Sequence, residues 1–304
     1  MTQRPEPGAA VSAPTHSAAY GTGLMAIASV LFAAMAVLTR SVSGQMSSGQ
    51  LVVIRFSIGL VGVAAIFAWR RQGPRMPRPG MLAMRGLLGG ASVYCYFVAI
   101  ERLGVGPATL LNYSSPVYAA PFAFLFLGER PRAHLWVGLG VASVGACLVA
   151  YSTVDPSRPF HLGVGAWAGL ASSVLSGAAM TGIRSLRKDT DATTIFMSFC
   201  VFGGLIALPF ALRAWTPMTP ALWVPAIGVG VLSLLAQLVF TYAFGFVTAA
   251  AGSATTQLTP ALSWLMAILF LREQAKALTF LGALLCFAGV LWGATAGATR
   301  PQRL

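Results

Sequence analysis

The sequence predicts an all-α polytopic membrane protein with ten transmembrane helices, arranged as two inverted five-helix repeats around a central cavity. Hydrophobic residues make up 57% of the chain and charged residues only 9%, far from the balance of soluble proteins. The sequence also matches itself at a constant shift of 144 residues, without a gap. Pro116 aligns with Pro260 and Glu129 with Glu273 at this shift, so the two halves are predicted to share one fold.

The first half contains five apolar segments in succession. Each is long enough to cross about 30 Å of hydrocarbon as a helix. A basic stretch precedes the third segment, and a short turn with Gly128 and Glu129 separates the fourth from the fifth. The predicted spans of this half are 21–40, 49–69, 82–100, 107–127 and 134–151.

The second half repeats these five segments and leaves no room for a separate soluble domain. Its predicted spans are 162–184, 192–212, 221–243, 247–271 and 278–296. The predicted organisation is a disordered cytoplasmic tail at 1–20, a first repeat at 21–151, a periplasmic loop at 152–161, a second repeat at 162–296 and a cytoplasmic tail at 297–304.

The distribution of basic residues predicts the orientation. With both termini in the cytoplasm, 13 of the 20 Lys and Arg residues lie inside, Arg85 among them, and six lie outside. The net charge of +13 then reflects topology and attraction to anionic lipid, and nucleic acid is not expected as a partner. Because five spans are an odd number, the second repeat enters the membrane inverted. Inverted repeats are typical of transporters, whose substrate site lies between the halves.

Arg55 is the one basic residue that this distribution does not place on either side. It lies within the second span, and Phe199 occupies the equivalent position of the second repeat. An arginine inside the membrane is costly and is by default a candidate functional residue. Alternatively, its side chain reaches the outer surface or pairs with a backbone carbonyl. Both interpretations stay open at this stage.

The seven acidic residues all fall at span ends, in loops or in the N-terminal tail. Ion-driven carriers commonly need a carboxylate inside the membrane, so this distribution predicts a facilitator driven by the substrate gradient, although carbonyls can also bind sodium. Glu129 and Glu273 are expected to cap or pair within the short turns that follow the fourth and ninth spans. The three histidines and four cysteines show no metal or redox spacing. Neither an enzyme nor a cofactor or metal site is therefore predicted.

The fourth and ninth spans each carry a polar stripe that ends in a proline. In the fourth, Thr109, Asn112, Tyr113 and Pro116 share one helical face, and the ninth repeats the pattern up to Pro260. Each proline frees the carbonyl four residues earlier, which is tolerated at membrane depth only against protein or a water-filled cavity. The alternative is a pair of kinks whose polar groups satisfy one another. The repetition of both features favours a cavity.

Other spans can complete the wall of this cavity. The eighth contributes a stripe of Ser233, Gln237 and Thr241, and Trp167 in the sixth is either a wall residue or an interfacial anchor. The wall is expected to be aromatic and hydrogen-bonding, without a buried charge, which suits small amphipathic solutes. The predicted substrate-binding residues are Tyr96, Asn112, Tyr113, Ser115, Pro116, Trp167, Gln237, Thr256, Gln257 and Pro260.

Small residues are spaced by four in the fifth and tenth spans. Gly138, Ala142 and Ala146 form one such face, and Gly289 and Gly293 form the other. Faces of this kind allow close contact between helices. Packing inside a monomer is favoured, and a dimer through these two spans stays open.

The chain resembles the EamA-type branch of the drug/metabolite transporter superfamily. The resemblance rests on the two five-helix halves, a proline late in each fourth helix, and the Leu-Phe-Leu-Gly-Glu and Leu-Phe-Leu-Arg-Glu turns, and the segment from Asn112 to Pro116 is similar to that of an amino-acid exporter. It implies export of aromatic and other neutral amino acids and related small metabolites across the bacterial inner membrane by alternating access. The lipid bilayer and a small-molecule substrate are then the partners. A drug or other metabolite carrier, with proton coupling, is the alternative.

Overall fold

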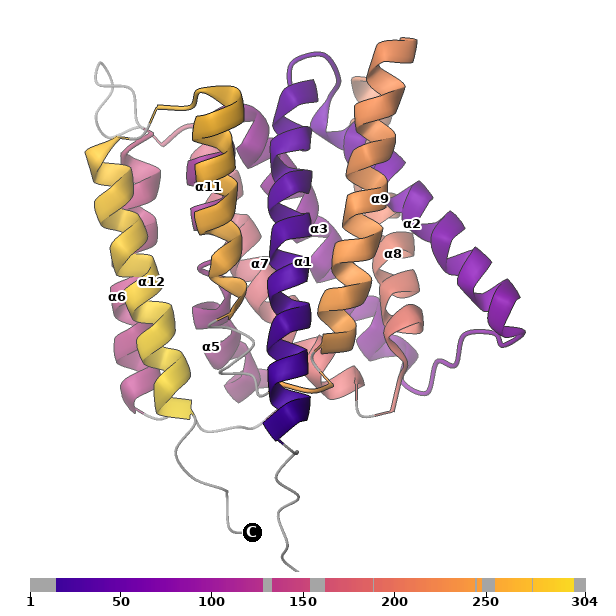
Figure 1. Cartoon of the computed structure of the whole chain (residues 1–304), viewed down its shortest axis with the longest axis horizontal. Coiled ribbons are helices and arrows are strands. Elements are labelled where there is room, and N and C mark those ends of the chain that lie inside the picture. The colour runs from indigo at the N-terminus through magenta and orange to yellow at the C-terminus, as the bar shows by residue number, and fades with distance from the viewer. Residues whose placement is uncertain are drawn as a thin grey trace, which may run out of the picture.

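The computed structural model of the protein describes residues 15–127, 133–153, 162–187, 189–243, 245–247, 255–274 and 276–297 (Figure 1). These residues form helices joined by short connections, without a β-strand among them. In the first half they are α1 (Thr15–Val42), α2 (Ser48–Arg70), α3 (Pro79–Leu103), α4 (Val105–Asn112), α5 (Ser115–Leu127) and α6 (Ala133–Tyr151). In the second half they are α7 (Val164–Leu186), α8 (Ala192–Arg213), α9 (Pro220–Ala243), α11 (Leu258–Leu271) and α12 (Ala277–Gly297).

Six of these helices are long and apolar enough to cross a membrane, namely α1, α2, α3, α7, α8 and α9. Shorter apolar helices lie within α6, α11 and α12. Large hydrophobic side chains such as Val61, Leu212 and Phe270 are more than 60% exposed, as expected where a helix faces lipid. The protein is therefore a multi-pass membrane protein.

Local chemistry explains several helix ends. The side chain of Ser47 accepts a hydrogen bond from the backbone N–H of Gln50 and so caps the start of α2. Asp191 caps α8 in the same way by accepting from the N–H of Thr194. Pro79 stands in the first turn of α3, where its missing N–H costs nothing.

The expected spans differ from the observed helices in two places. The expected N-terminal tail at 1–20 is too long, because α1 already begins at Thr15. The fourth span, expected as one bent helix, is two helices, with Tyr113 and Ser114 between α4 and α5. Pro116 explains the interruption, since a proline cannot donate a backbone hydrogen bond and clashes with the carbonyl four residues earlier. The start of the expected ninth span and the loop at 154–161 lie outside the described residues.

The main contacts between helices follow the internal repeat. If each helix in a contacting pair is replaced by its equivalent 144 residues away, the resulting pair is also in contact. α3 packs on α7 as α1 packs on α9, α3 packs on α8 as α2 packs on α9, and α5 packs on α7 as α1 packs on α11. The pairs α2–α8 and α6–α12 each join equivalent helices. Figure 1 shows α6 and α12 side by side at one edge of the bundle, with α1 between α11 and α9.

The small residues of α6 and α12 face each other within the chain. A Cβ atom added at Gly145 would lie 2.6 Å from the backbone nitrogen of Cys286, and one added at Gly289 would lie 2.5 Å from that of Ala142. Only glycine allows the two backbones to approach this closely. The small-residue stripes therefore bring α6 and α12 together.

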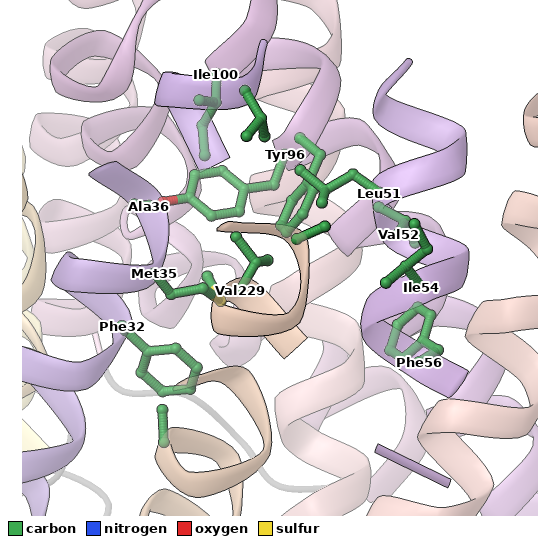
Figure 2. Packing of buried hydrophobic residues seen from close by; sticks show 14 of the residues in the cluster. Phe32, Met35, Ala36, Leu51, Val52, Ile54, Phe56, Tyr96, Ile100 and Val229 are labelled. Atoms are coloured by element: carbon green, nitrogen blue, oxygen red, sulfur yellow. The ribbon is translucent and has the colours of Figure 1, made fainter. Parts of the chain in front are cut away.

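The largest apolar core lies among α1, α2, α3, α8 and α9. Figure 2 shows Phe32 and Met35 from α1 on one side of it and Leu51 and Phe56 from α2 on the other, with Tyr96 between them. This packing holds together helices from both halves of the chain around the cavity described below.

Candidate functional site

A cavity of about 110 Å³ lies between the two halves of the protein. Its wall is built from α1, α2, α3, α5 and the end of α4 in the first half, and from α7, α8 and α9 in the second, with Thr256 just before α11. Apolar side chains such as Phe32, Met35 and Phe240 form one part of the wall. Polar side chains such as Ser176 and Gln237 share this wall with the apolar ones, so the cavity can hold a solute that has both apolar and hydrogen-bonding groups.

The interruption between α4 and α5 forms part of the wall. Asn112, Tyr113, Ser115 and Pro116 all line the cavity. The side-chain amide of Asn112 donates a hydrogen bond of 3.1 Å to the hydroxyl of Ser172 on α7. These contacts place the polar end of α4 against the second half of the chain, beside the cavity.

Gln257 stabilises this interruption from the other half. Its side-chain nitrogen donates a hydrogen bond of 3.0 Å to the backbone carbonyl of Tyr113. Gln257 is buried and does not line the cavity, and Pro260 is buried in the same way. The two residues, expected in the wall, therefore lie behind it.

Tyr96, Gln237 and Thr256 line the cavity as expected from the polar stripes. On α9, the side-chain amide of Gln237 donates a long hydrogen bond of 3.4 Å to the hydroxyl of Thr241. Trp167 is placed differently, because it is 61% exposed and does not line the cavity. Its position fits the alternative of an interfacial anchor.

Two buried arginines change the expected chemistry of the cavity. Arg55 is 3% exposed and Arg85 is 5% exposed, and both line the cavity. The expectation that the wall lacks a buried charge is therefore wrong, because an arginine side chain keeps its positive charge in proteins. Arg85, counted among the cytoplasmic basic residues, is buried at the cavity wall and is therefore not a surface residue. Helical spacing could have revealed it, since Arg85 shares one face of α3 with Gly89, Ser92 and Tyr96.

Both guanidinium groups lie against aromatic rings. The Cζ atom of Arg85 lies 4.4 Å from the ring centre of Phe199, and that of Arg55 lies 5.7 Å from the same ring. Arg55 also stands 5.0 Å from the ring of Phe56 and 5.5 Å from that of Phe97. Each such contact contributes roughly 0.5–2 kcal/mol, less than the several kcal/mol that burying an ion costs. Phe199 is thus the ring that the two cations share.

A second charged group lies at the N-terminus of α4. The carboxylate of Glu273 accepts hydrogen bonds from the backbone N–H groups of Val105 at 2.8 Å and Gly106 at 3.1 Å, and it lies 3.8 Å from Arg40. Glu273 was expected to act within its own turn. It instead caps a helix of the other half, where the helix dipole favours a negative charge. Glu129, its counterpart, lies outside the described residues.

Arg78 links the start of α3 to the connection after α7. Its Nε lies 2.8 Å from a carboxylate oxygen of Asp189, and it also donates to the side chain of Ser185 at 2.8 Å. The hydrogen bond from Arg78 lowers the pKa of Asp189 below its ordinary value. This pair joins helices of the two halves.

Comparison with known proteins shows relatives along nearly the whole chain. The sequence pattern of the EamA-like transporter family matches residues 19–151 and again residues 163–294. The pseudopaline exporter CntI of Pseudomonas aeruginosa is 31% identical over 269 residues, which cover 87% of this chain and 92% of the exporter. A probable terminal-alkyne amino-acid exporter of Streptantibioticus cattleyicolor is 26% identical over 247 residues, covering 76% of this chain and 80% of that protein.

One solved crystal structure has a similar fold. It superposes with a TM-score of 0.64 at 19% sequence identity, covering 92% of this chain and 99% of the other, and at this identity the likeness concerns the fold alone. The two family matches and the long alignment with an exporter together show to which family the protein belongs. The chain belongs to the EamA-like transporter family, within the drug/metabolite transporter superfamily.

Proposed function

We propose that the protein exports amino acids, aromatic and neutral ones among them, and related small metabolites across the bacterial inner membrane by alternating access. The observation that carries this proposal is the cavity between the two halves, whose wall combines apolar side chains with hydrogen-bonding groups. The relative named as a probable amino-acid exporter supports the substrate class. The matching family is one of transporters and the named relative is an exporter, so we propose that this chain too is a transporter and not an enzyme.

Two repeats of five spans would provide the moving parts. The two family matches, at 19–151 and 163–294, and the matching sets of helix contacts support this division. Rocking of one repeat against the other would open the cavity to each side of the membrane in turn. Both termini would lie in the cytoplasm, as the basic residues indicate. Reporter fusions at each end would test this orientation.

Seven of the residues expected to bind substrate are retained in the proposed site. They share a position on the cavity wall, and they are Tyr96, Asn112, Tyr113, Ser115, Pro116, Gln237 and Thr256. Gln257 and Pro260 would act indirectly by supporting the α4–α5 interruption. Trp167 is left out because it is exposed away from the cavity.

Transport would follow the substrate gradient. The residues that line the cavity include no Asp or Glu among those described, so a carboxylate that could couple a proton or sodium ion is missing from this wall. In the cell, net export would then follow from an excess of substrate in the cytoplasm.

A flux screen in proteoliposomes tests the function. Purified protein would be reconstituted and supplied with radiolabelled amino acids, sugars and cationic dyes. We expect saturable counterflow of amino acids that persists without a pH or sodium gradient. Transport of dyes alone, with amino acids inert, would instead support a drug carrier and overturn the proposal.

A further inference from the structure

The two arginines of the cavity lack an acidic partner in the part of the chain that is described. The ion pairs found there involve Arg40, Arg78 and Arg102, and the carboxylates concerned lie at the helix ends. Arg55 and Arg85 therefore place two positive charges beside one cavity without compensation from these groups. Buried charges in proteins are normally paired, so this arrangement calls for a partner from outside the chain.

Both arginines also have hydrogen-bond donors that are unused. Nη1 of Arg55 and both Nε and Nη1 of Arg85 are buried and have no hydrogen-bond partner among the described residues. A buried donor without an acceptor is rare in proteins, because it has lost water without gaining a substitute. Unused donors of this kind at a cavity are suited to bind an anionic ligand, whose oxygens would accept their hydrogen bonds.

The protein holds each guanidinium group in position. Nε of Arg55 donates to the hydroxyl of Ser233 on α9, and Arg85 stacks on Phe199 of α8. Gly89, one turn after Arg85, provides the space that the guanidinium occupies, since a methyl group there would collide with Nη1 of Arg85. Uncharged groups thus hold both guanidinium groups in place before a ligand binds, and none of these groups compensates the positive charges.

We propose that Arg55 and Arg85 form a binding site for two carboxylates, in which each arginine binds one carboxylate of an amino-acid-like dicarboxylate. This inference rests on the proposed function and narrows its substrate class. A substrate with two carboxylates neutralises both cations and satisfies donors of both. A neutral amino acid presents a single carboxylate, so one of the two arginines keeps an unpaired buried charge. The site therefore prefers acidic over neutral amino-acid-like solutes.

Matched ligands separate this preference from general amino-acid transport. Binding to the purified full-length protein would be measured with L-glutamate, L-glutamine, succinate and O-phospho-L-serine, and counterflow of the two amino acids would be measured in proteoliposomes. Glutamate and glutamine are nearly isosteric and differ in one negative charge. We expect glutamate and succinate to bind, and glutamine to bind at least about 10-fold more weakly, as the loss of one charged hydrogen-bonded contact requires.

Variants assign the effect to the arginines. Arg55→Gln and Arg85→Gln should each weaken glutamate binding about 10- to 100-fold, whereas the control Arg102→Gln, whose side chain is 64% exposed, should leave it unchanged. Gly89→Ala keeps both charges but displaces Arg85, and it should also weaken binding. The melting temperatures of the two Gln variants should not fall below that of the native protein, because an unpaired buried charge has been removed.

The outcomes are distinguishable. Equal binding and transport of glutamine and glutamate, insensitive to Arg85→Gln, would overturn the dicarboxylate site and leave amino-acid export standing. Succinate binding that is lost in the Gln variants, without counterflow of any amino acid in the flux screen, would support the site and overturn the proposed function. Binding of phosphoserine without glutamate or succinate would overturn the dicarboxylate class. Lower melting temperatures with unchanged affinity would make the arginines structural and overturn the site. Binding of none of the four ligands would also overturn the dicarboxylate site, and the flux screen with the other amino acids would then decide the proposed function.

Discussion

Two glutamines with nearly the same burial provide a sharp test of the site. Gln257 is 8% exposed and Gln237 is 7% exposed, but only Gln237 lines the cavity. Gln257 instead satisfies the backbone carbonyl of Tyr113 at the α4–α5 interruption, across a distance of 3.0 Å. Replacing each by leucine keeps the side-chain size and removes the amide, so the two substitutions should have opposite consequences.

Gln257→Leu should destabilise the protein. It leaves the Tyr113 carbonyl without this donor next to the membrane core, at a cost of about 1–3 kcal/mol. The affinity of the folded protein for substrate should change little. Gln237→Leu breaks only a long bond of 3.4 Å to Thr241, so stability should change by less than about 1 kcal/mol, while substrate affinity falls about 10-fold.

Measurements on the same purified samples separate these effects. Unfolding would be followed by titration with a denaturing detergent, and substrate binding would be measured with each value corrected for the folded fraction. If Gln257→Leu reduces affinity without reducing stability, Gln257 reaches substrate and its structural role is refuted. If Gln237→Leu lowers stability and leaves affinity intact, the cavity assignment of α9 fails.

Three further predictions concern contacts between the halves. Glu273→Gln should lower the free energy of unfolding by about 1–2 kcal/mol, because a charged cap on the N–H of Val105 becomes neutral, and an unchanged unfolding midpoint would contradict the cap. The hydrogen bond from Arg78 lowers the pKa of Asp189, so this bond should contribute fully to stability above an ordinary Asp pKa of about 3.9. Its contribution should be lost as the pH falls through the lower pKa of the folded protein. The difference in stability between Asp189→Asn and the native protein should therefore shrink on acidification, and a difference that stays constant would refute this prediction. Gly289→Ala should destabilise by about 1–3 kcal/mol, because the added methyl would lie 2.5 to 2.7 Å from atoms of α6, and native stability would show that α6 and α12 are not packed this closely.

Hydropathy was sufficient to locate most helices. The expected spans 49–69 and 192–212 nearly coincide with α2 and α8, because a membrane helix must present a continuous apolar run of defined length. Pro116 also predicted where the fourth span departs from a regular helix. The full break of this span into two helices was not predicted, because the Tyr113 carbonyl at the break is satisfied by Gln257 from the other half, a contact that a linear pattern does not show.

Arg85 shows why the chemistry of the site was harder to predict. Its place near the end of an apolar segment made a cytoplasmic position the simplest interpretation, and the count of basic residues was consistent with it. Whether an arginine one or two turns inside a helix faces lipid, water or a cavity depends on how the helix is rotated. That rotation is decided by the packing of α3 against α7 and α8.

The sequence by itself determined the membrane class, the approximate helices, the family and the polar stripes, because these follow from composition, period and internal repetition along one chain. Only the tertiary structure decided which stripes meet at the cavity, that Trp167 and Gln257 lie outside its wall, and that Arg55 and Arg85 stand against the same ring of Phe199. The physical reason is that burial and charge pairing depend on contacts between helices far apart in the chain. The spacing of residues along the sequence determines which of them share a face of a helix. Which other helix that face contacts is determined by tertiary packing.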